Sequence, residues 1–224
     1  SEVLNQICCS ARKTLRFYVL DSPDTATILN LEKKLNLKST LFIVASKSGG
    51  TIETLSQFHY FYSRLEKACG KKGRDKIGKH FIAITDEGSP LEELAARKKF
   101  RKVFLNPQDV GGRYSALSYF GMVPAGLLGI DLRSILNQAR EFLSHAKAEN
   151  KIEKNLGLYL GIVLGLLAKK GRDKVTFWLS PALRSFGSWL EQLIAESTGK
   201  EGKGILPVEG ESYLDWKDYG SDRV

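Results

Sequence analysis

Short apolar runs alternate with helical segments over residues 40–105, and this alternation limits the possible folds more than any other feature of the chain. The runs Thr40–Ala45, Phe81–Thr85 and Lys102–Leu105 have the length and composition of buried strands. Between them, Thr51–Cys69 and Pro90–Lys98 carry apolar residues at helical spacing. Strands that alternate with helices predict an α/β fold, in which helices cover both faces of a parallel sheet.

The flanking pattern predicts one α/β unit followed by the start of a second. The further elements expected are the tail of a helix over residues 1–13, a strand at Leu15–Leu20, a helix that starts at Asp21–Asp24, helices at Tyr114–Leu128, Leu132–Glu149 and Ile152–Lys169, a strand at Lys174–Leu179, a helix at Ala182–Glu196 and a short strand at Ile205–Val208. We place one domain at residues 1–145, lacking its first strand, and a truncated second domain at residues 146–224. The chain is therefore expected to be a piece of a longer protein.

Composition narrows the class of protein. The chain has 224 residues and no apolar run near the roughly 20 residues of a membrane-spanning helix. The formal net charge of +9 could indicate nucleic-acid binding, but Lys and Arg are spread along the chain, which favours a solvated basic surface. Three cysteines and three histidines, without zinc-type spacing, predict a reduced, cytoplasmic protein with no metal site.

The segment Ala45–Thr54 joins a predicted strand to a predicted helix through a turn rich in hydroxyl groups and glycine. The start of a helix presents unpaired N–H groups, and glycines let an anion approach the backbone. Ser46, Ser48 and Thr51 are spaced to surround a phosphate, and Lys47 adds a positive charge. The alternative is an ordinary turn in which Ser48 or Thr51 only caps the helix.

A second glycine-rich segment, Asp109–Ser118, places Arg113 directly after two glycines. A guanidinium group in this setting could stabilise an oxyanion during a reaction. The alternative, which this segment taken alone favours, is an arginine paired with a nearby acidic side chain.

The third segment, Glu191–Lys200, places Glu196 near the carboxyl end of a predicted helix. The helix dipole disfavours a negative charge there, which would make this carboxylate a better general base. The alternative is a solvated glutamate in the last turn.

Together the three segments resemble the phosphoglucose isomerase family. The motifs are Ser-Lys-Ser-Gly-Gly-Thr-Ile-Glu-Thr at residues 46–54, Val-Gly-Gly-Arg-Tyr-Ser at 110–115 and Ala-Glu-Ser-Thr-Gly-Lys at 195–200. Gly49-Gly50 and Thr198 vary from the usual pattern in a way that resembles bacterial forms, including isomerase halves fused to transaldolase. The resemblance covers most of the chain and implies two sugar isomerase (SIS) domains, each a flavodoxin-like parallel sheet between helices.

The resemblance also implies roles for the site residues in exchanging glucose 6-phosphate and fructose 6-phosphate. Ser46, Ser48 and Thr51 would bind the substrate phosphate with Lys47 beside them. Arg113 would stabilise a cis-enediolate, and Glu196 would move the proton between C1 and C2. No cofactor is implied, and the full-length protein is expected to be a homodimer.

Two departures from the family pattern qualify this expectation. The family has a glycine turn before the first motif, and a ring-opening histidine and a lysine after the glutamate motif, and none of these is present in this sequence. We therefore expect the 224-residue chain by itself to be inactive. The alternative function is a non-catalytic SIS module that senses sugar phosphates, which would need the Ser46–Thr51 turn but no placed base.

Overall fold

The computed structural model describes residues 2–8, 15–147 and 151–224, which form two compact units. The first unit contains the described residues up to Leu127, apart from the helix α1 (Glu2–Cys8). The second unit consists of α1 together with residues 128–224. The division into domains at residue 145 stays a prediction, because compactness is not a test of independent folding.

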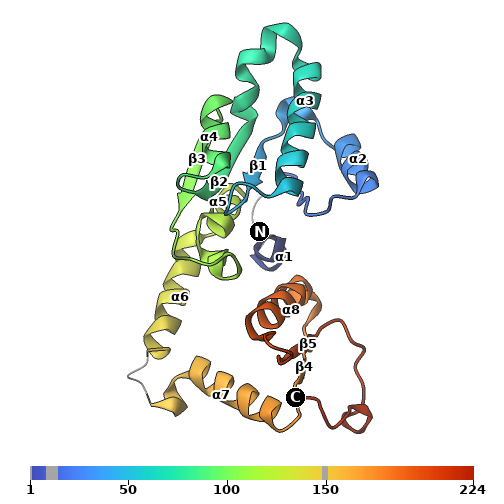
Figure 1. Cartoon of the computed structure of the whole chain (residues 1–224), viewed down its shortest axis with the longest axis vertical. Coiled ribbons are helices and arrows are strands. Elements are labelled where there is room, and N and C mark those ends of the chain that lie inside the picture. Colours follow the sequence, from blue (N-terminus) through green and yellow to red (C-terminus); the bar gives the residue numbers. More distant parts are fainter. Residues whose placement is uncertain (1, 9–14, 148–150) are drawn as a thin grey trace. The chain divides into compact units, whose positions relative to one another are not determined.

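The first unit is built on a parallel sheet with the strand order β1-β2-β3 (Figure 1). Its strands are β1 (Phe42–Ala45), β2 (Phe81–Asp86) and β3 (Lys102–Asn106). The first five residues of β2, Phe81–Thr85, are all buried, as expected for a central strand covered on both faces. This confirms the parallel α/β class predicted from the alternating pattern.

Helices α3 (Ile52–Gly73), α4 (Pro90–Arg97) and α5 (Tyr119–Leu127) pack against the strands of this sheet. The hydrophobic core joins side chains of the strands to those of α3 and α4, and its fully buried members include Leu65, Phe81 and Leu91. Because α3 and α4 each follow a strand directly, the core also fixes the turns that lead from strand to helix.

The predicted strand at Leu15–Leu20 is wrong. These residues form no ladder with any described strand, and Leu15, Tyr18 and Val19 are exposed. An apolar run has strand propensity, but a strand forms only where a partner edge accepts its hydrogen bonds. The helix that follows, α2 (Thr25–Lys34), begins as predicted, because the Asp24 carboxylate accepts a hydrogen bond from Thr27 N at 2.7 Å.

The predicted helix at Tyr114–Leu128 is divided in two. A 3₁₀ helix, η3 (Gly112–Leu117), comes first, and α5 starts only after the extended residue Ser118. Asn106 at the end of β3 explains the break, because its Oδ1 accepts a hydrogen bond from Tyr119 N at 3.1 Å and so fixes the start of α5.

Besides α1, the described residues of the second unit form three further α-helices and a short parallel strand pair. The helices are α6 (Leu132–His145), α7 (Leu156–Lys169) and α8 (Arg184–Thr198), and the strands are β4 (Lys174–Thr176) and β5 (Leu206–Val208). The end of the chain pairs with β4, since Val224 N donates to the Lys174 carbonyl at 2.7 Å. The remaining 3₁₀ helices of the described ranges are η1 (Leu37–Ser39), η2 (Arg74–His80), η4 (Ile152–Lys154), η5 (Pro181–Leu183) and η6 (Trp216–Asp218).

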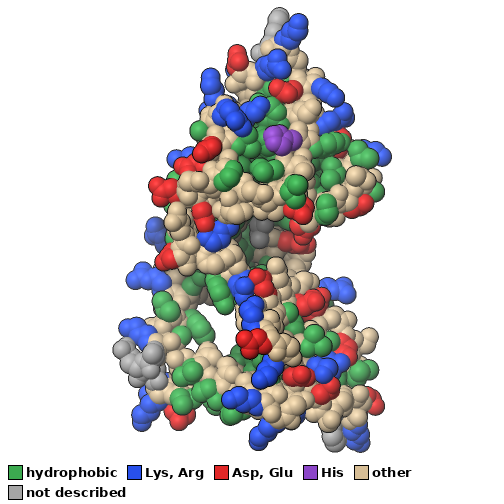
Figure 2. All heavy atoms as spheres, viewed as in Figure 1, with side chains coloured by type: hydrophobic (Ala, Val, Ile, Leu, Met, Phe, Trp, Pro, Cys, Tyr) green, Lys and Arg blue, Asp and Glu red, His purple; other side chains and the backbone are tan. Residues whose placement is uncertain are grey.

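Basic side chains are scattered over the visible face instead of forming one patch (Figure 2). None of the helices in the described ranges is both long and apolar enough to cross a membrane. The parts of the predicted helices that fall on residues 9–13 and 148–149 lie outside the described residues.

Candidate active site

The hydroxyl-rich turn lies at the carboxyl end of β1, where Ser46 N still donates to the Ile84 carbonyl of β2 at 3.0 Å. Ser46 is buried, and its Oγ accepts a hydrogen bond from Gly49 N at 3.1 Å. The same Oγ lies 2.8 Å from Thr51 Oγ1. These bonds close the turn on itself and bring two of the three predicted hydroxyl groups together.

The first turn of α3 is left without a side-chain cap. Thr51 occupies the N-cap position, but its hydroxyl forms no capping bond. Ser48 is exposed, and its Oγ accepts from Gly50 N at 3.3 Å, within the turn. The arrangement therefore differs from the simple capping alternative, and the unpaired N–H groups and positive dipole end of α3 suit an anion.

Close packing against the residues at the start of α4 holds the turn at residues 46–51 in place. Gly49 has a φ of +69°, and a Cβ at this position would lie 2.7 Å from Cβ of Ser89, which precedes α4. Ser89 is fixed in turn, because its hydroxyl lies 2.7 Å from Thr85 Oγ1 and also accepts from Glu92 N at 3.2 Å. Only glycine fits both the backbone angle and the available space.

The side chain of Lys47 reaches the end of β2 and the segment after β3. Its ammonium forms an ion pair with Asp86 and donates to the Gln108 carbonyl at 3.2 Å. The sequence reasoning missed Asp86 and Gln108. The available signal was the polar pair Thr85-Asp86 that ends an otherwise apolar strand.

Arg113 is half-buried in η3, within the first unit. The segment that leads to it starts at Asn106, which is the register partner of Asp86. Asp86 Oδ1 and Asn106 Nδ2 are buried without a hydrogen-bond partner among the described atoms. Leaving a buried polar atom without a partner costs free energy, so these two atoms call for an explanation.

Glu196 lies in the last turn of α8, in the second unit, and is exposed to solvent. The segment after it is well fixed. Lys200 Nζ donates to the Glu196 carbonyl at 3.2 Å, and the Thr198 hydroxyl accepts from Ile205 N at 2.9 Å. The structure thus groups Ser46, Lys47, Ser48 and Thr51 in one turn, places Arg113 in the same unit and places Glu196 at a helix end of the other unit.

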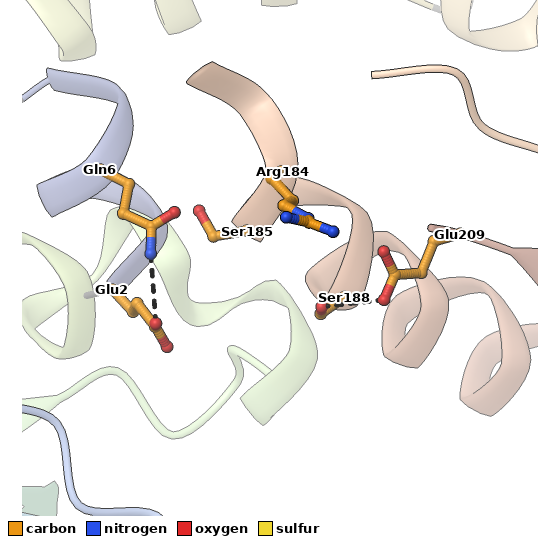
Figure 3. A pocket seen from close by; sticks show the side chains of 6 residues that line it. All are labelled: Glu2, Gln6, Arg184, Ser185, Ser188 and Glu209. Atoms are coloured by element: carbon orange, nitrogen blue, oxygen red, sulfur yellow. Dashed lines mark hydrogen bonds between the residues drawn. The ribbon is translucent and has the colours of Figure 1, made fainter. Parts of the chain in front are cut away.

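Two pockets lie elsewhere. One of about 270 Å³ in the second unit is lined by Glu2, Gln6, Arg184, Ser185, Ser188 and Glu209 (Figure 3). The other, of about 280 Å³, lies at the amino edge of the sheet and is lined by Lys38, Ser39, Thr40, Leu41, His80 and Arg101. Neither contains a predicted site residue. Among the described residues, no three His, Cys, Asp or Glu side chains gather as metal ligands would.

The parallel sheet between helices, with a hydroxyl- and glycine-rich turn at its carboxyl edge, is an α/β fold of the SIS type. The sequence profile of the family described as Phosphoglucose isomerase matches residues 3–207. The chain belongs to this family.

Individual relatives agree with this assignment. The glucose-6-phosphate isomerase of Methanocaldococcus jannaschii is 35% identical over 192 residues, which cover 85% of this chain and 46% of the relative. That of Carboxydothermus hydrogenoformans is 34% identical over 196 residues, or 88% of this chain and 41% of the relative. The chain spans less than half the length of either relative.

Two solved structures are similar in fold. A hypothetical protein from Thermus thermophilus has a TM-score of 0.82 and 31% identity, over 93% of this chain and 50% of that one. A glucose-6-phosphate isomerase from Chlamydia trachomatis has a TM-score of 0.69 and 27% identity, over 83% of this chain and 35% of that one.

Proposed function

We propose that the natural protein containing this chain interconverts glucose 6-phosphate and fructose 6-phosphate in glycolysis and gluconeogenesis. The observation that carries the proposal is the turn at residues 46–51, in which the Ser46 and Thr51 hydroxyl oxygens lie 2.8 Å apart and Thr51, the N-cap residue of α3, makes no side-chain capping bond. Family membership and the names of the relatives support the same reaction. The proposed setting is cytoplasmic, and the proposed assembly is a homodimer; fusion to transaldolase stays a prediction.

Each residue has a defined task in this reaction. Ser46, Ser48 and Thr51 bind the substrate phosphate through hydroxyl and backbone N–H donors, which are strongest toward a charged acceptor. Lys47 lies beside them. Arg113 stabilises the negative charge of the cis-enediolate and helps to keep water away. Glu196 removes the proton from one of C1 and C2 and returns it to the other, so no cofactor is required.

The test replaces the proposed base in the natural protein. Glu196→Gln keeps the size and polarity of the side chain but cannot accept the proton, so kcat should fall by roughly 10²- to 10⁴-fold with little change in KM. The rate is measured by coupling glucose 6-phosphate formation to its dehydrogenase. Glu191→Gln, on the same helix, is the matched control and should retain normal turnover.

Two results would contradict the proposal. Glu196→Gln with most of its turnover would remove this residue from the role of base. A wild-type protein that binds glucose 6-phosphate but never converts it would instead support a sugar-phosphate sensor.

A further inference from the structure

The side chain of Lys47 connects three segments that are distant in the sequence. Lys47 belongs to the turn after β1, Asp86 ends β2, and Gln108 lies in the segment after β3. The ammonium forms an ion pair with Asp86 and donates to the Gln108 carbonyl at 3.2 Å. The Lys47 and Asp86 side chains are only 31% and 18% exposed, so the pair is partly shielded from water.

Backbone contacts strengthen the same connection. Asp86 N donates to the Lys47 carbonyl at 3.2 Å, and the Thr85 hydroxyl donates to that carbonyl at 3.4 Å. On the other side, Gln108 Nε2 donates to the Glu87 carbonyl at 3.3 Å. The turn after β1, the end of β2 and the segment after β3 are therefore joined by both side-chain and backbone bonds.

The segment that carries Arg113 is bonded to neighbouring elements at both ends. At its far end, Asn106 Oδ1 holds Tyr119 N, as described above. At its near end, the contacts with Lys47 and Glu87 hold Gln108. Between these ends, Val110 N donates to the Pro107 carbonyl at 3.4 Å and Tyr114 N donates to the Gly111 carbonyl at 2.9 Å. The bonds of Gln108 to Lys47 and Glu87 therefore join the start of the segment that carries Arg113 to the ends of β1 and β2.

We propose that Asp86 is a positioning residue that holds the Lys47 ammonium at the ends of β2 and β3, so that the phosphate turn and the Arg113 segment keep one geometry. This inference rests on the proposed function. Without the charge of the Asp86 carboxylate, the Lys47 ammonium loses its ion-pair partner. Nothing then favours the conformation in which the ammonium donates to the Gln108 carbonyl over one in which it is solvated. Asp86 acts through Lys47 and does not need to touch substrate.

The first test measures the geometry without relying on catalysis. Amide hydrogen exchange is followed in the 224-residue chain at Val110 and Tyr114, whose N–H groups donate to Pro107 at 3.4 Å and Gly111 at 2.9 Å. Asp86→Asn should accelerate exchange at these amides at least tenfold, while the amides of β2 and α4 stay protected. Lys47→Met should do the same, and the double variant should add nothing further, because both changes break one connection.

Glu66→Gln is the matched control, since it removes a carboxylate from an ion pair with Arg74 on the same unit, where the Arg74 side chain is 73% exposed. It should leave the exchange of Val110 and Tyr114 unchanged. Normal exchange in both Asp86→Asn and Lys47→Met would overturn the proposal, as would two additive effects.

The second test is kinetic and uses the natural protein. Asp86→Asn should lower kcat by roughly ten- to a hundredfold, the usual cost of displacing a supporting group, with KM within about threefold. A raised KM with unchanged kcat would overturn the proposal, because Lys47 and Asp86 would then act only in binding. If the wild-type protein isomerises nothing, the proposed function fails, whereas the exchange experiment still decides the role of Asp86.

Discussion

At the scale of single residues, Ser48 is the hydroxyl group of the turn best placed to meet a ligand. It is exposed, and its oxygen accepts from Gly50 N, which leaves its own O–H available to donate. Ser46 and Thr51, in contrast, are bonded to each other. Ser48→Ala should therefore weaken the binding of glucose 6-phosphate by about 1.5–3 kcal/mol, the value of a hydrogen bond to a charged group.

Isothermal titration of the natural protein with glucose 6-phosphate measures this loss. Ser39→Ala is a suitable control, because Ser39 also lies next to β1 but at the amino edge of the sheet, where its hydroxyl donates to the Asn36 carbonyl. Equal affinities for wild type and Ser48→Ala would show that this hydroxyl does not contact the phosphate.

At the scale of elements, the turn between β1 and α3 depends on Gly49. Alanine there would be strained at a φ of +69°, and its Cβ would lie 2.8 Å from Leu91 N as well as close to Ser89. We expect Gly49→Ala to destabilise the first unit by roughly 1–3 kcal/mol. Gly50→Ala is the matched control, since a Cβ at Gly50 meets nothing within 4 Å.

Exchange protection of the β2 amides gives the free energy of opening for each variant. A Gly49→Ala chain as well protected as Gly50→Ala would mean that the turn can shift without cost, contrary to the packing seen here.

Glu32 of α2 connects this helix to α3. The Glu32 carboxylate accepts a hydrogen bond from the hydroxyl of Tyr60 in α3 at 2.6 Å and forms an ion pair with Arg64 of the same helix. The Tyr60 bond and the Arg64 guanidinium lower the pKa of Glu32 below its ordinary 4.5. A lowered carboxyl pKa contributes stability that is present above the unfolded pKa, and the contribution is lost as the pH falls through the folded pKa.

Glu32→Gln should therefore reduce the free energy of unfolding of the first unit at pH 7 by on the order of 1 kcal/mol. It should also make the unfolding less sensitive to pH below about 4.5 than it is in the wild type. Urea titrations at pH 7 and pH 4, followed through the amide signals of α2, measure both effects. Glu66→Gln serves as the control, and a wild-type pH profile in Glu32→Gln would contradict the assignment.

Helices and strands were predicted correctly where the residues within or next to the element are enough to specify it. The runs at β1, β2 and β3 are short and apolar, the intervening helices carry a helical spacing, and Asp24 marks the start of α2. The errors occurred where residues distant in the sequence determine the local structure. Residues 15–20 have the composition of a strand without a paired edge, and the start of α5 depends on Asn106.

At the scale of the whole molecule, the candidate site could be found only in part from the sequence. The turn at residues 46–51 was visible because its residues are consecutive, and Arg113 and Glu196 were singled out because the three motifs occur together. Asp86 and Gln108 were not, because only the sheet register brings them next to Lys47.

The steps that the proposed reaction requires lead to a prediction for the 224-residue chain by itself. Isomerisation needs a held phosphate, a moved proton and an opened sugar ring, and the positions of His59, His80 and His145 do not match that of the ring-opening histidine that the family resemblance implies. The purified chain should bind sugar phosphate weakly and turn over more than tenfold more slowly than the natural protein in the coupled assay. Turnover within about tenfold, a barrier difference near 1.4 kcal/mol, would show that ring opening uses other residues.

The second unit is assembled from two stretches of chain, and this affects the order in which the molecule folds. Helix α1 contacts α8 and η5, although the whole of the first unit lies between them in the sequence. Forming that contact in an unfolded chain means closing a very long loop, and the entropic cost of closure rises with loop length. The first unit, built from nearer neighbours, is therefore expected to form early, and α1 is expected to dock last and to detach first.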